Sequence, residues 1–187
     1  MINVNTFSKG ITYEDEGEIY LVLEAQHSKQ GRGQANVKAK VKNLRTGAIT
    51  IKSYTGGQEM KKAHIEKRKM NYLYSDGENI VLMDEETYEQ IEIPVEHVKW
   101  EMNFIVEGSK VQIRKYQEEV LDIEIPDNVT LTVTEAPDAV KGNTTTNPQK
   151  KVIVETGFEL ETPMFIKEGD KISVSTETGK YVGKANK

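Results

Sequence analysis

The chain has 187 residues, with 25 Lys and Arg against 30 Asp and Glu, so its net charge is -5. At about 100–200 residues per domain, this length allows one or two domains, or a few very small ones. The sequence lacks cysteine, which excludes disulfides, thiol nucleophiles and Cys-ligated metal sites. No apolar run reaches the roughly 20 residues of a membrane-spanning helix, and the N-terminus lacks a signal-peptide layout. A cytoplasmic protein without membrane contact is therefore expected.

The charges divide the chain into three parts. Residues 1–63 carry 10 Lys and Arg against 6 Asp and Glu, a net of +4. Residues 64–126 carry 7 against 15, a net of -8, and residues 127–187 carry 8 against 9, a net of -1. We take these parts as three predicted domains. Between Ala25 and Gln58 there are seven cations and no carboxylate, which is typical of a polyanion-binding surface or of a solvated basic face.

Most segments have the short, β-branched composition of strands. Strands are predicted at residues 18–24, 35–42, 80–83, 89–93, 111–114, 129–133, 152–154 and 171–175. Turn signals such as Thr46-Gly47 and Asp76-Gly77 separate them, so the chain is predicted to be all-β, with three small barrels. One helix is predicted after Pro94, because Val98, Met102 and Ile105 would share one helical face.

The segment 35–42 alternates strictly between small apolar residues and lysines. Side chains alternate across a strand with period two, so Lys38, Lys40 and Lys42 share one face. The apolar run 19–23 precedes this strand, which predicts a hairpin whose tip contains Gly31-Arg32-Gly33. Glycine tolerates positive φ, so the backbone can turn tightly and leave Arg32 projecting from the apex. Taken alone, such a tip is also compatible with an ordinary surface turn.

Four groups of motifs, in order along the whole chain, resemble the bacterial elongation factor P family. The first is the hairpin His27-Ser-Lys-Gln-Gly-Arg-Gly-Gln-Ala35, followed by an Asn-Leu-Arg-Thr-Gly segment that ends at Gly47. The second is Met70-Asn-Tyr-Leu-Tyr-Ser-Asp-Gly77. The third combines residues 150–157 with residues 163–170, and the fourth is the tail Gly179-Lys-Tyr-Val-Gly-Lys184.

The resemblance implies a KOW-like barrel followed by two OB-fold-type barrels in an L-shaped, tRNA-like arrangement. It implies a translation elongation factor with no catalytic residue of its own, no cofactor and no metal. Such a factor binds the ribosome between the peptidyl-tRNA and exit sites and promotes peptide-bond formation, which relieves stalling at consecutive prolines. The implied partners are the 70S ribosome, its rRNA and the peptidyl-tRNA, and the chain is expected to be a monomer.

Two groups of residues are implied to contact RNA or the ribosome. The first group, around the basic hairpin, comprises Lys29, Gly31, Arg32, Gly33, Lys38, Lys40, Lys42 and Arg45. The second group, in the third domain, comprises Gly142, Asn143, Thr144, Tyr181 and Lys184. For Tyr181 a place in the barrel core is an alternative.

The sequence departs from the family pattern at several of these positions. Arg32 stands where most members have a lysine that is modified, and Gln30 replaces a proline. A subset of the family has arginine at the tip and glycosylates it, so a modifying enzyme is an implied partner unless Arg32 is unmodified. In the third domain Asn143 replaces an Asp, and Lys184 replaces an Arg. Lysine keeps the charge but loses the planar fork of arginine.

Other interpretations remain open from the sequence. They are a paralogue that resembles elongation factor P, a general oligonucleotide-binding protein, and a β-rich hydrolase with an unrecognised carboxylate site. Tyr72 and Tyr74 are interpreted either as core residues or as platforms for base stacking. The three histidines, His27, His64 and His97, lack the spacing of a metal site.

Overall fold

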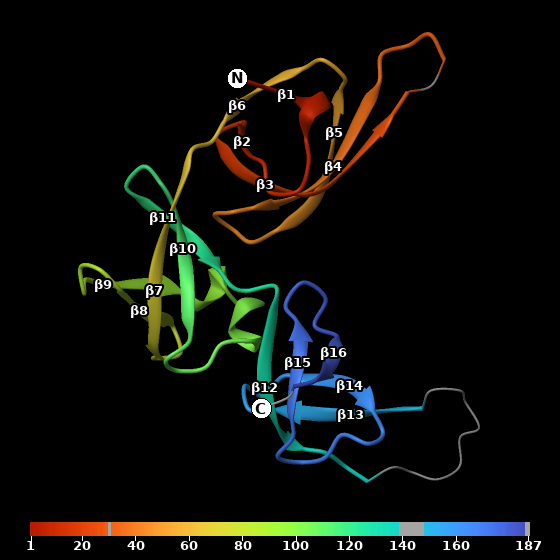
Figure 1. Cartoon of the computed structure of the whole chain (residues 1–187). Helices are drawn as coiled ribbons and strands as arrows, with labels where there is room; N and C mark the ends of the chain where they lie inside the picture. Colours follow the sequence, from red (N-terminus) through yellow and green to blue (C-terminus); the bar gives the residue numbers. More distant parts are fainter. Residues whose placement is uncertain (30, 139–147, 186–187) are drawn as a thin grey trace. The chain divides into compact units, whose positions relative to one another are not determined.

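The computed structural model describes residues 1–29, 31–138 and 148–185. In these ranges the regular structure consists of strands and short 3-10 turns, and the strands form three sheets (Figure 1). The prediction of an all-β fold with three β domains is therefore confirmed. No helix in the described ranges is long and apolar enough to cross a membrane.

The first sheet has the strand order β1-β6-β2-β3-β4-β5. Its strands are β1 (Ile2–Asn3), β2 (Thr12–Asp15), β3 (Glu18–Ser28), β4 (Asn36–Asn43), β5 (Ile49–Thr55) and β6 (Glu59–Lys62). A 3-10 turn, η1 (Val4–Thr6), follows β1. The alternation predicted for residues 35–42 is confirmed, because Val37, Ala39 and Val41 are fully buried in the core of this barrel.

The second sheet has the strand order β11-β10-β7-β8-β9. Its strands are β7 (Ile65–Ser75), β8 (Asn79–Asp84), β9 (Gln90–Pro94), β10 (Lys110–Tyr116) and β11 (Glu119–Glu124). The turn after β7 is fixed by the Asp76 carboxylate, which accepts hydrogen bonds from the backbone amides of Glu78 and Asn79. Tyr72 is buried, whereas Tyr74 is half exposed.

The prediction of a helix after Pro94 is wrong. Pro94 is the last residue of β9, and two separate 3-10 turns follow it, η2 (Val95–His97) and η3 (Glu101–Asn103). The β-branched valines of this segment weaken helix formation. Tertiary packing also competes with it, because the Trp100 indole N–H donates to the Thr176 carbonyl at 2.7 Å and its ring packs edge-to-face on Phe104.

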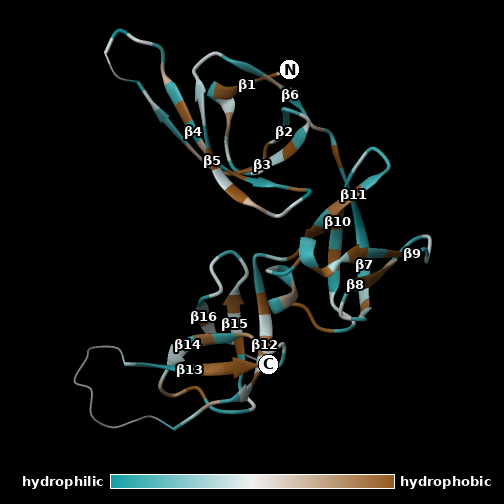
Figure 2. Cartoon of the chain, turned by 180° about the vertical axis from the view of Figure 1, so that it is seen from behind, coloured by the Kyte–Doolittle hydropathy of each residue, from teal (hydrophilic) through white to brown (hydrophobic). Residues whose placement is uncertain are grey.

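The third sheet has the strand order β14-β13-β12-β15-β16. Its strands are β12 (Asn128–Glu135), β13 (Gln149–Val154), β14 (Glu159–Pro163), β15 (Lys171–Ser175) and β16 (Tyr181–Lys184). Alternate residues of β12, β13 and β15 are buried and meet in one core. Figure 2 shows the resulting brown segments on the strands, while many turns are teal or white.

The chain divides into two compact units. One comprises residues 1–68 and 113–123, and the other comprises residues 69–112 and 124–187. The first unit therefore joins the first barrel to most of the β10–β11 hairpin. A second apolar cluster links these two pieces, and its members are Ile19, Leu21, Leu44, Ala63, Ile65, Tyr116 and Leu121. The bounds proposed from charge, at residues 63 and 126, stay a prediction.

Candidate nucleic-acid interface

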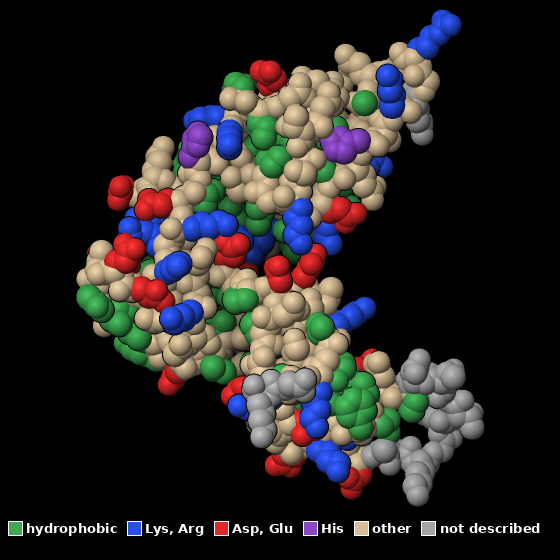
Figure 3. Space-filling view, in the orientation of Figure 1, with side chains coloured by type: hydrophobic (Ala, Val, Ile, Leu, Met, Phe, Trp, Pro, Cys, Tyr) green, Lys and Arg blue, Asp and Glu red, His purple; other side chains and the backbone are tan. Residues whose placement is uncertain are grey.

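The β3–β4 hairpin presents the predicted basic tip. The two strands pair from Tyr20 and Asn43 at the base to Ser28 and Asn36 near the tip. With a rise of about 3.3 Å per residue, the eight residues of β4 hold the tip roughly 26 Å from the base. Figure 3 shows Lys or Arg side chains at the end of this hairpin.

The geometry of the tip fits its glycines. Gly31 has a φ of +65°, a conformation that residues with a side chain rarely adopt. A Cβ built there would meet no atom within 4 Å, so glycine is favoured by the backbone conformation and not by a lack of space. Lys29, Arg32 and Gly33 are all exposed. The tip therefore places a cation in solvent, where a large partner can reach it. Gln30 lies outside the described residues.

Two of the predicted lysines line the outer face of the hairpin. Lys38 and Lys40 are exposed on the face opposite the barrel core. Lys38 lies between Gln26 of β3 and Ser53 of β5 in the strand register, and Lys40 lies opposite Glu24 on the β3 side. The structure thus brings together Lys29, Arg32, Lys38 and Lys40 on one extended hairpin.

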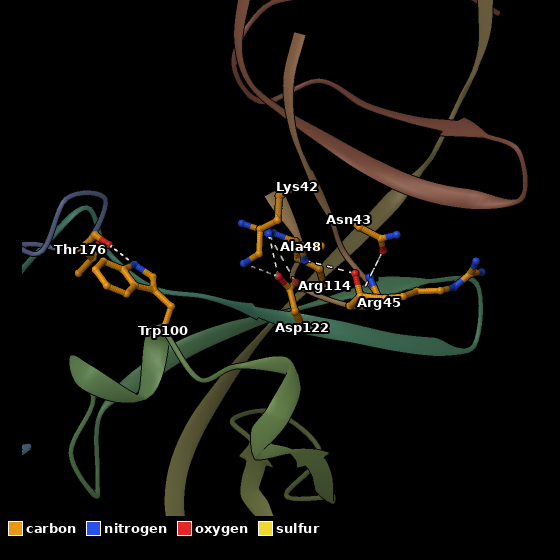
Figure 4. A network of polar contacts seen from close by, with 9 residues as sticks. Lys42, Asn43, Arg45, Ala48, Trp100, Arg114, Asp122 and Thr176 are labelled. Atoms are coloured by element: carbon orange, nitrogen blue, oxygen red, sulfur yellow. Dashed lines mark hydrogen bonds and ion pairs between the residues drawn. The ribbon is translucent and has the colours of Figure 1, made fainter. Parts of the chain in front are cut away.

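Lys42 has an internal partner. Its Nζ lies 3.4 Å from a carboxylate oxygen of Asp122, whose side chain is 1% exposed (Figure 4). Arg114 approaches the same oxygen at 3.1 Å. A buried carboxylate that loses a cation is strongly destabilised, so this triad holds Lys42 in a structural position at the base of the hairpin.

Arg45 also has a structural partner in the first unit. Its Nε and its second terminal nitrogen donate to the two Glu119 oxygens at 2.9 and 3.1 Å, and its first terminal nitrogen donates to the Gly17 carbonyl at 2.6 Å. The hydrogen bond to Glu119 is the main reason that the pKa of Arg45 is raised above its usual value. Bidentate binding of this kind is directional, so Arg45 ties the β4–β5 turn to the β10–β11 hairpin.

The residues implied in the third domain are separated by the structure. Gly142, Asn143 and Thr144 lie outside the described residues. Tyr181 is half buried and packs against the core of the third sheet. Lys184 is half exposed, and its Nζ lies 3.6 Å from a carboxylate oxygen of Asp170. Contact of these residues with RNA stays a prediction.

Sequence reasoning missed a polar network inside the first barrel. The Tyr13 and Tyr54 hydroxyls are 2.8 Å apart, Tyr54 donates to the Asp15 carboxylate at 2.8 Å, and Lys52 pairs with that carboxylate at 2.9 Å. Burial raises the pKa of Tyr13 to about 12 and also raises that of Tyr54. Burial would raise the pKa of Asp15 too, but the hydrogen bonds from Lys52 and Tyr54 outweigh it and lower that pKa.

This network supports the hairpin from inside. Lys52 and Tyr54 belong to β5, which pairs with β4, and Lys52 also lies over the Tyr20 ring of β3 at 4.3 Å. No signal in the sequence marks these four residues, because they come from two strands far apart in the chain. Elsewhere in the described ranges, no group of three His, Asp or Glu side chains is placed to hold a metal ion.

Comparison with known proteins gives a consistent result over the whole chain. Residues 3–60 match the family model described as the elongation factor P (EF-P) KOW-like domain, residues 65–123 match its OB domain, and residues 129–184 match its C-terminal domain. The chain is 76% identical to elongation factor P of Mycoplasmopsis agalactiae and 72% identical to that of Mycoplasmopsis pulmonis, in each case over 100% of both chains.

Among solved structures, translation initiation factor 5A from Methanococcus jannaschii aligns with a TM-score of 0.49 and 19% identity. That alignment covers 66% of this chain and 92% of the other.

Proposed function

The chain belongs to the elongation factor P family of translation factors, and from that premise we propose that it binds the 70S ribosome between the peptidyl-tRNA and exit sites and promotes peptide-bond formation at consecutive prolines. In this role the chain supplies orientation, and the ribosome supplies the chemistry. Proline reacts poorly as a donor and as an acceptor, so correct placement of the reacting ends has a large effect on rate.

The observation that carries this proposal is the exposed Arg32 at the end of a long, paired hairpin. The hairpin projects a cation roughly 26 Å from its base, which suits entry into a narrow, RNA-lined site. Arginine stays charged and offers a planar fork of donors to phosphate. Lys38 and Lys40 would bind backbone phosphates along the same hairpin and release their counterions.

The proposal predicts that Arg32→Ala abolishes the relief of stalling and leaves the fold intact, because the side chain is exposed and Gly31 keeps the turn. The measurement is the synthesis of a reporter with three consecutive prolines in a translation system that lacks the endogenous factor. Lys62→Ala is the matched control, since Lys62 is an exposed cation of the same barrel outside the hairpin. Unchanged stimulation by Arg32→Ala would refute the assigned role of the tip.

Three further measurements separate the remaining alternatives. Arg32→Lys will retain much of the activity if positive charge is sufficient, and it will lose the activity if a sugar on the guanidinium is required. The intact mass of the natively expressed protein shows directly whether that sugar is present. Binding to naked single-stranded RNA as tight as binding to ribosomes would instead favour a general oligonucleotide-binding protein.

A further inference from the structure

The strand β5 forms one edge of the first sheet, where β4 is its hydrogen-bonded neighbour. It has seven residues, and its outward side chains include Ile49 and Ile51, which are 55% and 71% exposed. An open edge presents unpaired backbone donors and acceptors that can template another strand. A long edge strand with exposed isoleucines is therefore an unusual feature for a protein that stays unassociated.

The other edge strands of the described sheets carry protection that the outward face of β5 lacks. β9 and β14 have exposed Glu92, Glu159 and Glu161 along the strand, and each ends in proline. β11, the other edge of the second sheet, begins with the exposed Glu119. β1 has two residues, and β16 has four and pairs irregularly with β15. Outward charge, proline, shortness and irregular pairing all discourage strand addition. The only charge of β5 is Lys52, which lies on the inner face and pairs with Asp15. The outward face of this seven-residue strand presents Ile49, Ile51 and Ser53, without charge or proline.

The charges beside β5 indicate what an added strand should carry. Lys38 and Lys40 are exposed on β4, directly opposite Ser53 and Ile51 in the register. A strand added beside β5 would lie about 10 Å from β4, since neighbouring strands are about 4.8 Å apart, and extended lysine side chains reach most of that distance. Off the ribosome, where these lysines are not bound to phosphates, acidic side chains on the added strand would complement them. A second copy would bring the same basic segment, which holds seven cations and no carboxylate between Ala25 and Gln58, so charge opposes self-pairing.

We propose that β5 is a docking edge for an extended, acidic segment of a partner protein, which adds to the first sheet as a further strand. Backbone hydrogen bonds to the open edge would supply affinity. Apolar side chains of the added strand would contact Ile49 and Ile51, and its acidic side chains would pair with Lys38 and Lys40. The features of this edge fit a peptide better than RNA. Isoleucine lacks the aromatic face on which bases stack, whereas the alternating N–H and C=O groups of an open edge match the backbone of an extended peptide.

The test is a titration of the full-length, ¹⁵N-labelled chain with an end-blocked peptide of alternating Glu and Val, seven residues long, followed by amide chemical shifts. We expect shift changes centred on residues 49–55 and slower hydrogen exchange of β5 amides. The same peptide with Lys in place of Glu should bind at least tenfold more weakly. Absence of β5 shifts at millimolar peptide, or equal shifts with both peptides, would overturn the proposal.

Two variants make the result specific to this edge. Ile51→Glu gives β5 the kind of charge that protects β9 and β14, and it should weaken binding of the acidic peptide at least tenfold. Because the side chain of residue 51 is exposed, the substitution should leave the barrel folded. Val182→Glu is the control, because Val182 is 57% exposed on the edge strand β16, and it should leave binding unchanged. Equal loss of binding in both variants would refute a role for β5.

The same spectra distinguish other occupants. If β5 shifts depend on protein concentration in the absence of peptide, the edge pairs with a second copy and the proposal is wrong. If an oligouridine RNA shifts β5 amides at lower concentration than the acidic peptide, the edge belongs to RNA and the proposal is again wrong. Stimulation of polyproline synthesis is a separate readout, so failure here leaves the assignment of Arg32 untouched.

Discussion

At the scale of single residues, the same type of side chain has different roles at neighbouring positions. Lys40 is exposed, whereas two residues later Lys42 pairs with Asp122, and Arg45 forms a bidentate pair with Glu119. Because these cations lie in one basic segment of the sequence, all of them were expected to contact RNA. The difference arises from the β10–β11 hairpin, which lies against the base of the β3–β4 hairpin and supplies both carboxylates.

The pairing of Asp15 predicts a pH dependence of stability. Because the pKa of Asp15 is lowered by Lys52 and Tyr54 in the folded state, its contribution is complete above the unfolded pKa of about 4 and is lost as pH falls through the folded pKa. Asp15→Asn should cost roughly 1–3 kcal/mol of unfolding free energy at pH 7. The cost should shrink below pH ~4, as measured by urea unfolding across pH. An equal cost at pH 7 and pH 2 would show that the charge of Asp15 is immaterial.

At the scale of elements, different lysines of the β3–β4 hairpin are expected to affect ribosome binding and the stability of the fold. Changing both Lys38 and Lys40 to Gln should weaken ribosome binding and reduce its salt dependence by up to about two phosphate contacts, without loss of stability. Lys42→Gln should instead lower the free energy of unfolding, since Asp122 is buried and would lose a cation that pairs with it. Binding at several salt concentrations and denaturant unfolding distinguish the two effects. Normal binding of the double variant at every salt concentration would show that this face is only solvated.

Elements with local signals were predictable, and those that depend on distant partners were not. The strand at residues 35–42 could be predicted from its alternation of apolar and polar residues. Successive side chains of a strand point to opposite faces of the sheet, so the pattern itself shows which residues are buried. The helix after Pro94 failed because Trp100 is held by Thr176, which is 76 residues away. Likewise, the pairing of Arg45 with Glu119 could not be predicted, because Glu119 is 74 residues away and outside any local window. Contact of Arg45 with RNA stays a prediction.

At the scale of the whole molecule, the family match extends from residue 3 to residue 184, so the three domains are expected to act together. The L-shaped arrangement implied by the resemblance stays a prediction. So does contact of the third domain with the exit-site codon region, because residues 142–144 lie outside the described ranges. The described parts of the third domain nevertheless define how this contact can be tested.

The last prediction concerns residues 141–147, between β12 and β13. This segment contains Gly142, Asn143 and a run of threonines but hardly any apolar side chain, so its replacement should not disturb the third core, which is built from the flanking strands. Asn143 both donates and accepts hydrogen bonds and does not repel phosphate. Replacing residues 141–147 with Gly and Ser of equal length should therefore remove hydroxyl-radical protection of RNA near the exit-site codon. Protection around the hairpin tip should remain, whereas identical footprints of both chains would rule out the contact.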